Sequence, residues 1–525
     1  MNTRIWRRIT ILLAFLLTAT TLFACVSQPQ VEVVEVTRVS TNHPNSNESD
    51  PIETKAQDFY NSGIAYTENG EFEAAITAFS QALTLEPDFA PAYFNRGYNF
   101  ASLRNFENAI EDYEKALEYG FIDPIIYFNL GISYFEYGDF DRALENITTL
   151  IEISPQEAEA FSQRGQIYAA LGETRKALED FDQVIKLDNN FPGFYGIRGT
   201  AYLQLGEYDL AIEDLKRAIT LNQQPILAHF NLATVYLEIG EFDEANRNFE
   251  EVLLHFDDVI YATPEDPFAY YMGGVSSGFL GNLEKSISYL DMAIELDPQQ
   301  PDFYYRRGVS YSDLEEYNLS ISNYTAAINL DPKQPEYYLG RGYSYNNLEE
   351  YNLSISDYTA AIKLDPKQPE YYLQRSYSYN GLEEYNLSIS DYTAAIKLDP
   401  NNPDTYNSRG FTYNNVEDYL QAISDFTTAI ELDPGYAFAY NNRGWANSQL
   451  GNYDLAFQDF DKSFELDTNN AWVYYNRGIT YYELGDVDNA IADLERALQL
   501  DDPPLDEDRF NNASEKLDNL RDLGN

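Results

Sequence analysis

The feature that most constrains the fold of this chain is a repeat of 34 residues that runs from Ala56 to Pro504. One step departs from this period, the step of 41 residues between Ile226 and Pro267. Self-similarity at such a period is typical of proteins that stack one small unit many times, since each unit buries its apolar face only against its neighbours. The repeats begin at Ala56, Ala90, Pro124, Ala158, Pro192, Ile226, Pro267, Pro301, Pro335, Pro369, Pro403, Ala437 and Ala471.

Each repeat has the spacing of two amphipathic helices. Apolar residues fall at repeat positions 4, 8 and 11 and again at 20, 24 and 27, the intervals that place side chains on one face of a helix. Position 8 is Gly in eleven repeats, with Ala233 and Ser376 as the exceptions, and position 20 is Ala or Ser in all thirteen. Leu-Gly at positions 14 and 15 ends the first helix in several repeats, and Asp-Pro ends the second in others. We call these helices A and B.

These preferences resemble those of the tetratricopeptide repeat (TPR) family, and the resemblance covers residues 56–504. It implies an all-α fold, an α-α superhelical solenoid of about thirteen helix pairs without separate domains. Residues 505–525 follow as a capping helix, with an apolar face formed by Phe510, Ala513, Leu517 and Leu520. The 7-residue insertion lies near 253–266 and predicts a longer helix or a kink. Its acidic pairs lack the regular ligand spacing of a metal loop.

The thirteen repeats form an internal alignment, and two positions in it vary together. Position 7 is Arg in nine repeats, and position 23 of the same repeats is Asp, or Asn323 in the repeat of Arg307. The four repeats without Arg also lack Asp. We predict a semi-buried ion pair that joins helices A and B of one repeat, a structural role. The Arg-Asp pairs are Arg96 and Asp112, Arg164 and Asp180, Arg198 and Asp214, Arg341 and Asp357, Arg375 and Asp391, Arg409 and Asp425, Arg443 and Asp459, and Arg477 and Asp493.

The first residues are typical of a secretory signal. Three arginines (Arg4, Arg7 and Arg8) precede an apolar run that is too short to span a bilayer comfortably. Residues 22–25, Leu-Phe-Ala-Cys, resemble the lipobox of bacterial lipoproteins, although Phe23 departs from that pattern. The resemblance implies a signal peptide at 1–24 and lipid attached to Cys25. The alternative is ordinary cleavage near Ala24, which would leave a secreted protein.

Residues 25–55 are predicted to be the lipidated N-terminus and a flexible linker, because no helical pattern occurs there. The net charge of −52 disfavours nucleic acid and anionic lipid as partners of the folded part. The acidic surface keeps a long array in solution, or it attracts a basic protein or peptide. Contact with a membrane is then expected only through the lipid on Cys25.

In TPR proteins, positions 2, 5, 6, 9, 12 and 13 of helix A line the concave face of the solenoid. Here these positions carry many aromatic rings and amides, which suit an extended peptide. The asparagines at position 6 are similar to the asparagine ladder of the repeat domain of O-linked N-acetylglucosamine transferase, which implies contacts with a peptide backbone. The candidate residues are Tyr60, Asn61, Phe94, Asn95, Tyr98, Phe128, Asn129, Phe230, Asn231, Tyr271, Tyr305, Tyr343, Tyr377, Phe411, Asn442, Trp445, Tyr475 and Asn476.

Two alternatives apply to this face. The rings at position 5 could pack on the next repeat, and the asparagines could serve as caps or face solvent. The co-chaperone clamp for a C-terminal carboxylate, which is known from this family, does not carry over, because no repeat has Lys at position 2 or 5.

We therefore expect a binding scaffold at the cell envelope, extracytoplasmic and anchored by lipid, that recognises extended peptide or protein partners. The alternative is binding of a glycan or a cell-envelope polymer by the same face. No phosphate loop, nucleophile elbow, metal motif or cofactor motif is found, so we expect no catalytic activity. The nearly identical repeats between Pro301 and Asn402 indicate duplication and are expected to tune length rather than chemistry.

Overall fold

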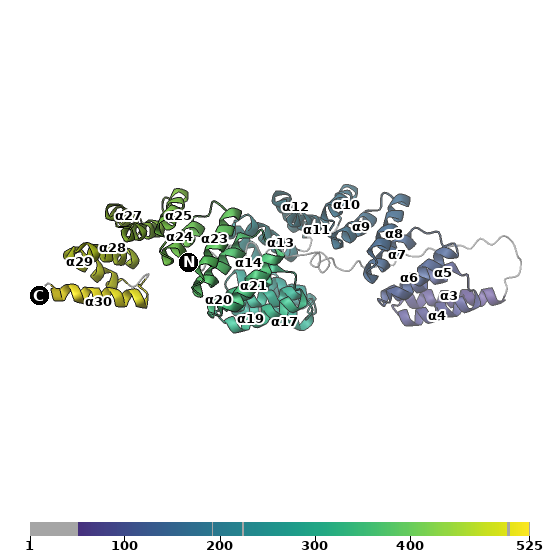
Figure 1. Cartoon of the computed structure of the whole chain (residues 1–525). Coiled ribbons are helices and arrows are strands. Elements are labelled where there is room, and N and C mark those ends of the chain that lie inside the picture. The colour runs from purple at the N-terminus through teal and green to yellow at the C-terminus, as the bar shows by residue number, and fades with distance from the viewer. Residues whose placement is uncertain (1–50, 192, 223–224, 501–503, 524–525) are drawn as a thin grey trace. The chain divides into compact units, whose positions relative to one another are not determined.

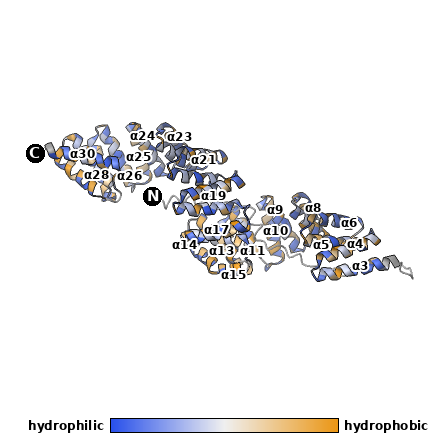
Figure 2. Cartoon of the chain, turned by 90° about the horizontal axis from the view of Figure 1, so that it is seen from below, coloured by the Kyte–Doolittle hydropathy of each residue, from blue (hydrophilic) through white to orange (hydrophobic). Residues whose placement is uncertain are grey.

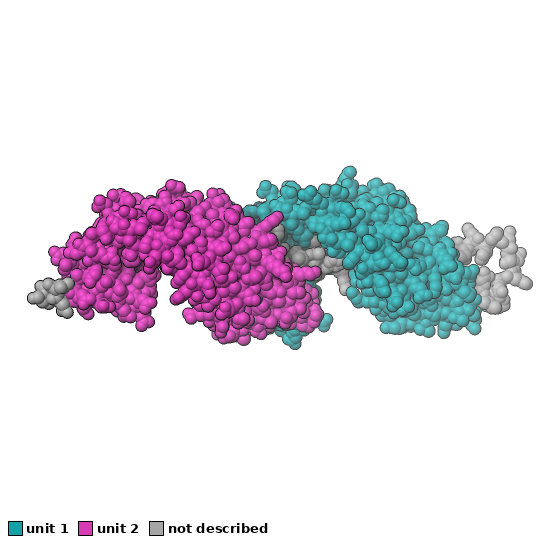
Figure 3. Space-filling view, in the orientation of Figure 1, with its two compact units in different colours: residues 1–296 teal, residues 297–525 magenta. Residues whose placement is uncertain are grey.

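The computed structural model describes residues 51–191, 193–222, 225–500 and 504–523. The predicted signal peptide, Cys25 and linker residues 26–50 lie outside the described residues. Within the described ranges every regular element is a helix, and the chain divides into two compact units, residues 1–296 (unit 1) and 297–525 (unit 2) (Figure 3). The all-α solenoid is confirmed, but its division between the seventh and the eighth repeat was not predicted, since the sequence suggested one array without separate domains.

Unit 1 holds seven helix pairs and one extra short helix (Figure 1). Its helices are α3 (Pro51–Glu68), α4 (Phe72–Leu85), α5 (Ala90–Ser102), α6 (Phe106–Glu118), α7 (Ile125–Tyr137), α8 (Phe140–Ile153), α9 (Ala158–Ala170), α10 (Thr174–Leu187), α11 (Phe194–Gln204), α12 (Tyr208–Thr220), α13 (Pro225–Glu238), α14 (Phe242–Leu254), α15 (Phe256–Ala262), α16 (Pro267–Phe279) and α17 (Leu283–Leu296).

Unit 2 holds six helix pairs and the C-terminal helix. Its helices are α18 (Pro301–Asp313), α19 (Tyr317–Leu330), α20 (Pro335–Asn347), α21 (Tyr351–Leu364), α22 (Pro369–Gly381), α23 (Tyr385–Leu398), α24 (Pro403–Asn415), α25 (Tyr419–Leu432), α26 (Ala437–Gln449), α27 (Tyr453–Leu466), α28 (Ala471–Leu484), α29 (Val487–Gln499) and α30 (Glu507–Leu523).

Within each unit, every helix A packs on the helix B that follows it, and each helix B packs on the next helix A. Hydrophobic and hydrophilic residues are interleaved along these helices, as Figure 2 shows, so each helix has one face for the core and one for solvent. The ring or aliphatic side chain at position 24 lies at the centre of each pair. Phe79, Phe181 and Tyr358 are examples, and all three are fully buried.

Glycine at position 8 makes room for that central side chain. A Cβ atom on Gly63 would lie 2.6 Å from Cε1 of Phe79, and one on Gly165 would lie 2.5 Å from Cε1 of Phe181. Real Cβ atoms do not approach carbon so closely, so the bare backbone of helix A lets the ring of helix B lie flat against it.

The turn between helices A and B requires a left-handed backbone at position 15. Glycine takes this conformation in eight of the repeats, for example Gly172 at a φ of 74°. In four successive repeats of unit 2 the residue is instead a glutamate, at φ values of 59° to 61°: Glu315, Glu349, Glu383 and Glu417. A side chain makes this conformation unfavourable by roughly 1–2 kcal/mol.

Two elements differ in detail from the sequence expectations. Helix α3 begins at Pro51, so residues 51–55 are helical rather than part of the linker. The insertion forms a separate short helix, α15, whose Phe256 is buried and packs its ring against Tyr289 with centroids 4.4 Å apart. The ring of Phe256 thus packs the inserted helix against the neighbouring helices.

Helix α30 covers the last helix pair as expected of a capping helix. Ala513, Leu517 and Leu520 are buried, and Ala513 and Leu520 belong to the same core cluster as Leu494 of α29. Phe510 was expected on this face but is 47% exposed, so that part of the prediction was wrong. No helix among the described residues combines the length and the apolar character needed to cross a bilayer.

Candidate functional site

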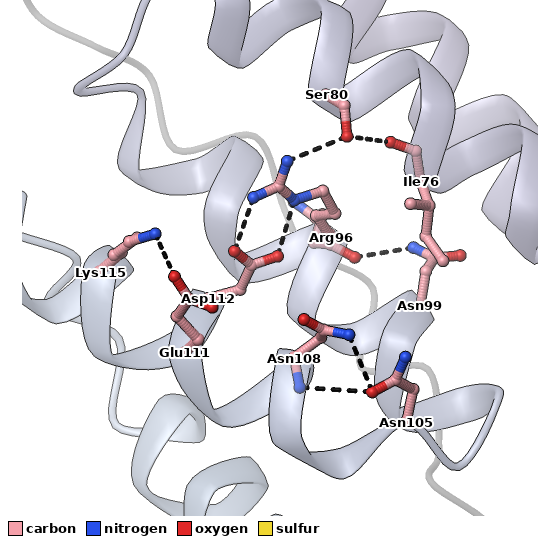
Figure 4. A network of polar contacts seen from close by, with 10 residues as sticks. Ile76, Ser80, Arg96, Asn99, Asn105, Asn108, Glu111, Asp112 and Lys115 are labelled. Atoms are coloured by element: carbon pink, nitrogen blue, oxygen red, sulfur yellow. Dashed lines mark hydrogen bonds and ion pairs between the residues drawn. The ribbon is translucent and has the colours of Figure 1, made fainter.

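The arginine at position 7 forms the predicted ion pair in all eight Arg-Asp repeats. In the second repeat, Nε and Nη2 of Arg96 each donate to one carboxylate oxygen of Asp112, both at 2.7 Å (Figure 4). Equivalent two-point contacts at 2.7–3.0 Å join the other seven pairs. Arg307 donates to Asn323 Oδ1 at 2.7 Å instead.

The last three pairs show that this geometry persists to the end of unit 2. Asp425 accepts from Nε and Nη2 of Arg409 at 2.8 and 2.7 Å. Asp459 accepts from the same two atoms of Arg443 at 3.0 and 2.7 Å. Asp493 accepts from those of Arg477 at 2.7 and 3.0 Å.

The pairs are semi-buried, as predicted, and the two partners share the burial unequally. The arginine side chains are 16–22% exposed. The aspartate side chains are only 3–10% exposed, because helix B turns them toward the core. The buried rather than semi-buried residues are Asp112, Asp180, Asp214, Asp357, Asp391, Asp425, Asp459 and Asp493.

Burial makes each aspartate depend on its arginine. Burial raises the pKa of Asp112, and the hydrogen bonds from Arg96 act in the opposite direction. For Arg341, the hydrogen bonds to Asp357 raise the pKa of the guanidinium. Each pair joins helix A to helix B through two hydrogen bonds.

A third contact ties the arginine to the preceding repeat. Nη1 of Arg96 donates to Ser80 Oγ at 2.9 Å, and Ser80 lies on helix B of the repeat before (Figure 4). Sequence reasoning missed this contact, although a hydroxyl or carboxyl group at position 25 of the preceding repeat would have indicated it. The acceptors in the other cases are Asp182, Thr325, Thr359, Thr393, Thr427 and Asp461.

Rings at positions 4 and 11 enclose the same guanidinium. The Cζ atom of Arg375 lies 6.0 Å from the ring centroid of Tyr372 and 5.8 Å from that of Tyr379. Such contacts between a cation and a π-system stabilise the arginine further. Arg96, Arg198, Arg341 and Arg409 each have two such rings, whereas one is found beside Arg164, Arg443 and Arg477, so these arginines have a structural role.

The aromatic residues at position 5 belong to the core, which corrects their assignment to the ligand surface. Phe94, Phe230, Tyr271, Tyr305 and Tyr475 are 2–9% exposed. Phe94 stacks on Phe121 with centroids 4.5 Å apart, and Tyr305 packs on Tyr337 of the next repeat at 5.1 Å. The two less buried members, Tyr60 and Phe128, also pack against core clusters. The alternative, packing on the next repeat, holds for Tyr305 and for Phe230, which contacts Tyr271, whereas Phe94 packs on rings of its own repeat.

The asparagines at position 6 mostly bond to the neighbouring repeat rather than stand free. Nδ2 of Asn95 donates to Tyr60 Oη at 3.0 Å, and Nδ2 of Asn231 to Thr200 Oγ1 at 2.7 Å. Asn442 and Asn476 donate to Asn407 and Asn441 of the repeat before, at 3.1 and 3.0 Å. Asn129 is buried and hydrogen-bonds Tyr113.

These amides therefore hold adjacent A helices together, in register, and are not a free ladder for a peptide backbone. Asn61, at the start of unit 1, differs in being exposed; its Oδ1 accepts from Gln57 of the same helix.

Position 9 is where unit 2 keeps aromatic rings at its surface. Tyr377 is 39% exposed and Phe411 38%, while Tyr343 and Trp445 are half-buried. The four residues, here called the ring row, stand on α20, α22, α24 and α26, one in each of four successive repeats. In unit 1 only Tyr98, which is half-buried, has a ring at this position.

A row of carboxylates at position 2 accompanies the ring row and was not predicted. Glu336, Glu370 and Asp404 begin the helices α20, α22 and α24, and Asp302 begins α18. We call these four residues the acid row. The signal was present in the sequence, because position 2 is acidic in four successive repeats.

Tyrosine and glutamine side chains orient the acid row. Oη of Tyr337 donates to Asp302 at 2.7 Å, Oη of Tyr436 donates to Asp404 at 2.6 Å, and Nε2 of Gln374 donates to Glu370 at 2.6 Å. Burial raises the pKa values of Asp302 and Glu336. One oxygen of Glu336 is buried and has no hydrogen-bond partner among the described residues.

The two rows lie close enough to interact. Burial raises the pKa of Tyr377, Ser408 lowers it through a hydrogen bond, and the charges of Glu370 and Asp404 raise it. Glu370 stands on the same helix as Tyr377, and Asp404 stands on the next helix A. In the space-filling view, unit 2 is hollowed on its lower side (Figure 3).

No group of three or more potential metal ligands occurs within the described ranges. In that part of the chain the site consists of aromatic rings, carboxylates and amides that are already hydrogen-bonded, an arrangement that can hold a ligand.

Comparison with known families matches repeat models along most of residues 63–502. A model described as "TPR repeat" matches 63–103, 199–240, 377–415 and 448–485. Four further models are described as "Tetratricopeptide repeat". One matches 158–191 and 471–502, the second matches 426–458, the third matches five segments between 90 and 436, and the fourth matches 230–301. A search of the curated proteins found no match.

Solved structures share the helical architecture at low identity. The crystal structure of the APC/C hetero-tetramer Cut9-Hcn1 matches at 16% identity and a TM-score of 0.49, over 89% of this chain and 97% of that chain. Yeast Tom70 matches at 18% identity and a TM-score of 0.37, over 84% and 97%. YrrB, a TPR protein with an unusual peptide-binding site, matches at 21% and 0.33, over 36% and 97%. No function transfers at this level of similarity.

Proposed function

Because the chain belongs to the tetratricopeptide repeat family, we propose that it is a protein-binding scaffold whose unit 2 holds an extended segment of a partner protein. The bound segment crosses the A helices α20, α22, α24 and α26. A lipid on Cys25 anchors the scaffold at the outer side of the cell membrane, and the acidic solenoid extends from it.

The ring row is the observation that carries this proposal. Tyr377 and Phe411 expose more than a third of their surface, whereas the rings at positions 5 and 24 are largely or fully buried. An aromatic side chain gives a binding surface much contact area at little cost in conformational entropy. Repeated on four adjacent helices, such rings offer a continuous track to an elongated ligand.

The hydrogen bonds of the neighbouring residues favour a peptide over a glycan. A sugar needs many free donors and acceptors, but the amides between the rings bond to one another, as Asn442 does to Asn407 and Asn380 to Thr412 at 3.1 Å. An extended peptide instead gains from apolar contact along its side chains. The exposed rings alone would still stack on sugars, so the experiment includes both ligand classes.

The test places a photo-crosslinking amino acid at Phe411 and, as a matched control, at Tyr98 of unit 1. In envelope extracts, the probe at 411 is expected to link to a segment of one partner protein, mapped by mass spectrometry. The probe at 98 is expected not to link to it. Tyr377→Ala with Phe411→Ala should abolish the capture of that partner, and Tyr98→Ala should leave it intact.

The same variants are then offered to a glycan array and to a peptide array. Glycan binding that is lost in the Tyr377→Ala/Phe411→Ala variant, without any peptide binding, would overturn the proposal in favour of a polymer-binding scaffold. Hydrogen exchange across α22 and α24 checks that both variants keep their fold.

The anchor is tested separately. Cys25→Ser should move the protein from the membrane fraction to the soluble fraction and abolish incorporation of an alkyne-tagged fatty acid. Unchanged membrane association and no fatty-acid label on the wild-type chain would exclude the lipid anchor while leaving the binding proposal untouched.

A further inference from the structure

We propose that the segment held by unit 2 is cationic, with lysine or arginine side chains recurring at about every third residue. This inference rests on the proposed function and names the chemistry of its partner. It follows from the charge of the acid row, from the position of the rings beside it and from the spacing of the A helices.

Charge is the first argument. Helices α20, α22 and α24 each contain one cationic residue, the arginine at position 7, and that guanidinium is bonded to the aspartate of its own repeat. The same helices each begin with a carboxylate of the acid row, Glu336, Glu370 or Asp404. These three helices therefore carry a negative charge that no cation of the same helix balances. A positively charged ligand would neutralise it.

The rings supply the second argument. A lysine or arginine side chain is attracted both by the face of an aromatic ring within about 6 Å and by a neighbouring carboxylate. Tyr377 provides such a ring on the helix that also carries Glu370, and Asp404 stands on the next helix A. Tyr343 has the equivalent position on α20, the helix of Glu336. A row of cation sites results, one for each repeat.

The A helices set the spacing of these sites. Adjacent A helices bond to each other directly: Oγ of Ser378 donates to Asn346 Oδ1 at 3.0 Å, and Asn442 donates to Asn407. Packed helices lie about 8–10 Å apart. A polyproline II segment rises about 3.1 Å per residue with three residues per turn, so one turn covers about 9 Å. Every third side chain of such a segment therefore faces the next site.

Polyanionic partners do not fit this arrangement. Nucleic acid and anionic lipid would be repelled by the acid row as well as by the net charge of −52. A basic protein segment is the macromolecule whose charge matches.

The experiment measures the binding of three labelled peptides to the purified full chain by fluorescence anisotropy. All have the same length and neutral residues. The first carries lysine at every third residue, the second the same number of lysines in one block, and the third glutamate at every third residue. We expect the first to bind at least about 10-fold more tightly than the second, and the third not to bind. Binding of the first should weaken with added salt.

Charge-matched variants identify the site. Glu370→Gln with Asp404→Asn should weaken binding of the first peptide at least about 10-fold, because both substitutions keep the hydrogen-bond acceptor and remove the charge. Glu431→Gln with Glu515→Gln removes two exposed charges elsewhere in unit 2 and should leave binding unchanged.

Failures of the inference and of the proposed function give different results. Equal binding of the spaced and blocked peptides would overturn the spacing, and equal loss in both double variants would show a non-specific charge effect. A neutral segment captured at Phe411 that depends on Tyr377 would overturn the cationic partner while leaving the scaffold proposal standing. Absence of any capture at Phe411 would count against the proposed function itself.

Discussion

Units 1 and 2 use the same internal frame but carry different surfaces. Both place Gly, or one small substitute, against the ring or aliphatic side chain at position 24, and both use the ion pair of Arg and Asp, as Arg164 and Arg375 show. Unit 1 varies position 9 from repeat to repeat, whereas unit 2 repeats a ring there over four helices and an acid at position 2 over four helices.

The difference shows how duplication acts in a solenoid. The nearly identical repeats from Pro301 to Asn402 were expected to tune length, but they also repeat an acid at position 2 three times and a ring at position 9 twice, while Phe411 and Trp445 lie outside them. A single exposed ring becomes a row only when its neighbours also carry a ring in register. In unit 1, where the repeats have diverged, position 9 carries a ring only at Tyr98.

The largest expected effect tests whether the clamp serves both units alike. Arg375→Ala leaves the buried Asp391 without its partner, and Arg164→Ala does the same to Asp180, so each should lower the free energy of unfolding by about 3–5 kcal/mol. Urea unfolding followed by hydrogen exchange of helices α9, α10, α22 and α23 measures the loss. Tolerance of the substitution in one unit only would show that the clamp is not a common element.

The next effect tests the close approach at position 8. Gly165→Ala in unit 1 and Gly342→Ala in unit 2 push a Cβ atom to 2.5 Å from Phe181 and 2.7 Å from Tyr358, and each should destabilise its unit by about 1–3 kcal/mol. Gly196→Ala is the control, because its Cβ atom meets only Ala218 at 3.9 Å. Thermal unfolding of the three variants is compared; an equal response at 165 and 196 would contradict the packing argument.

A smaller effect exploits the turn at position 15, where the units differ. Glu349→Gly relieves a left-handed backbone at a φ of 60° and should stabilise unit 2 by about 1 kcal/mol, while Gly172→Glu should destabilise unit 1 by a similar amount. The urea midpoints of the two variants, measured in parallel, should move in opposite directions. Shifts of the same sign would show that the turn conformation does not control stability here.

The smallest effect concerns pH and sets one carboxylate of unit 1 against one of unit 2. Burial raises the pKa of Glu238 to about 7 and that of Asp313 to about 6. The folded state then binds the proton more tightly than the unfolded state, so these groups contribute stability at low pH. That contribution is lost as pH rises from the unfolded pKa, about 4.3 for Glu and 3.9 for Asp, through the folded value.

Substitution separates the two groups. Glu238→Gln should reduce the fall in melting temperature of unit 1 between pH 5 and pH 8, and Asp313→Asn should act on unit 2 at somewhat lower pH. Unit-specific hydrogen exchange at both pH values follows each unit. A pH profile unchanged by Glu238→Gln would exclude this carboxylate as the cause.

Much of the fold was predictable because thirteen copies make an internal alignment. Gly at position 8 and the coupling of Arg96 with Asp112 emerged from comparing repeats, and the structure has both. The third bond of the arginine, to Ser80, was missed because it crosses from one repeat to the one before. A pair of positions that vary together within one repeat does not reveal such a contact.

The sequence predicted semi-buried ion pairs, and the structure has them, but the sequence did not show which partner is the more buried. The coupling of positions 7 and 23 indicates a contact, but it does not say how far each partner lies from solvent. Packing of helix B against the next helix A buries aspartates such as Asp425, Asp459 and Asp493, while the longer arginine side chains keep part of their surface exposed.

The candidate site was predicted less well. Phe94 and Tyr377 both lie on helix A at positions that the family assigns to the concave face, yet one is 3% and the other 39% exposed. From the 34-residue period alone, both side chains are predicted to be exposed. Which ring is covered depends in part on the side chains of the next repeat, such as Tyr337 against Tyr305.

The sequence by itself determined the helix pairs, their frame and the ion pairs, because these depend on contacts within one repeat, and the repeat is written thirteen times. Only the tertiary structure decided the division at residue 296, the burial of the position 5 rings and the exposure of Tyr377 and Phe411. The physical reason is that exposure belongs to the packing of one repeat on the next, which no single repeat contains.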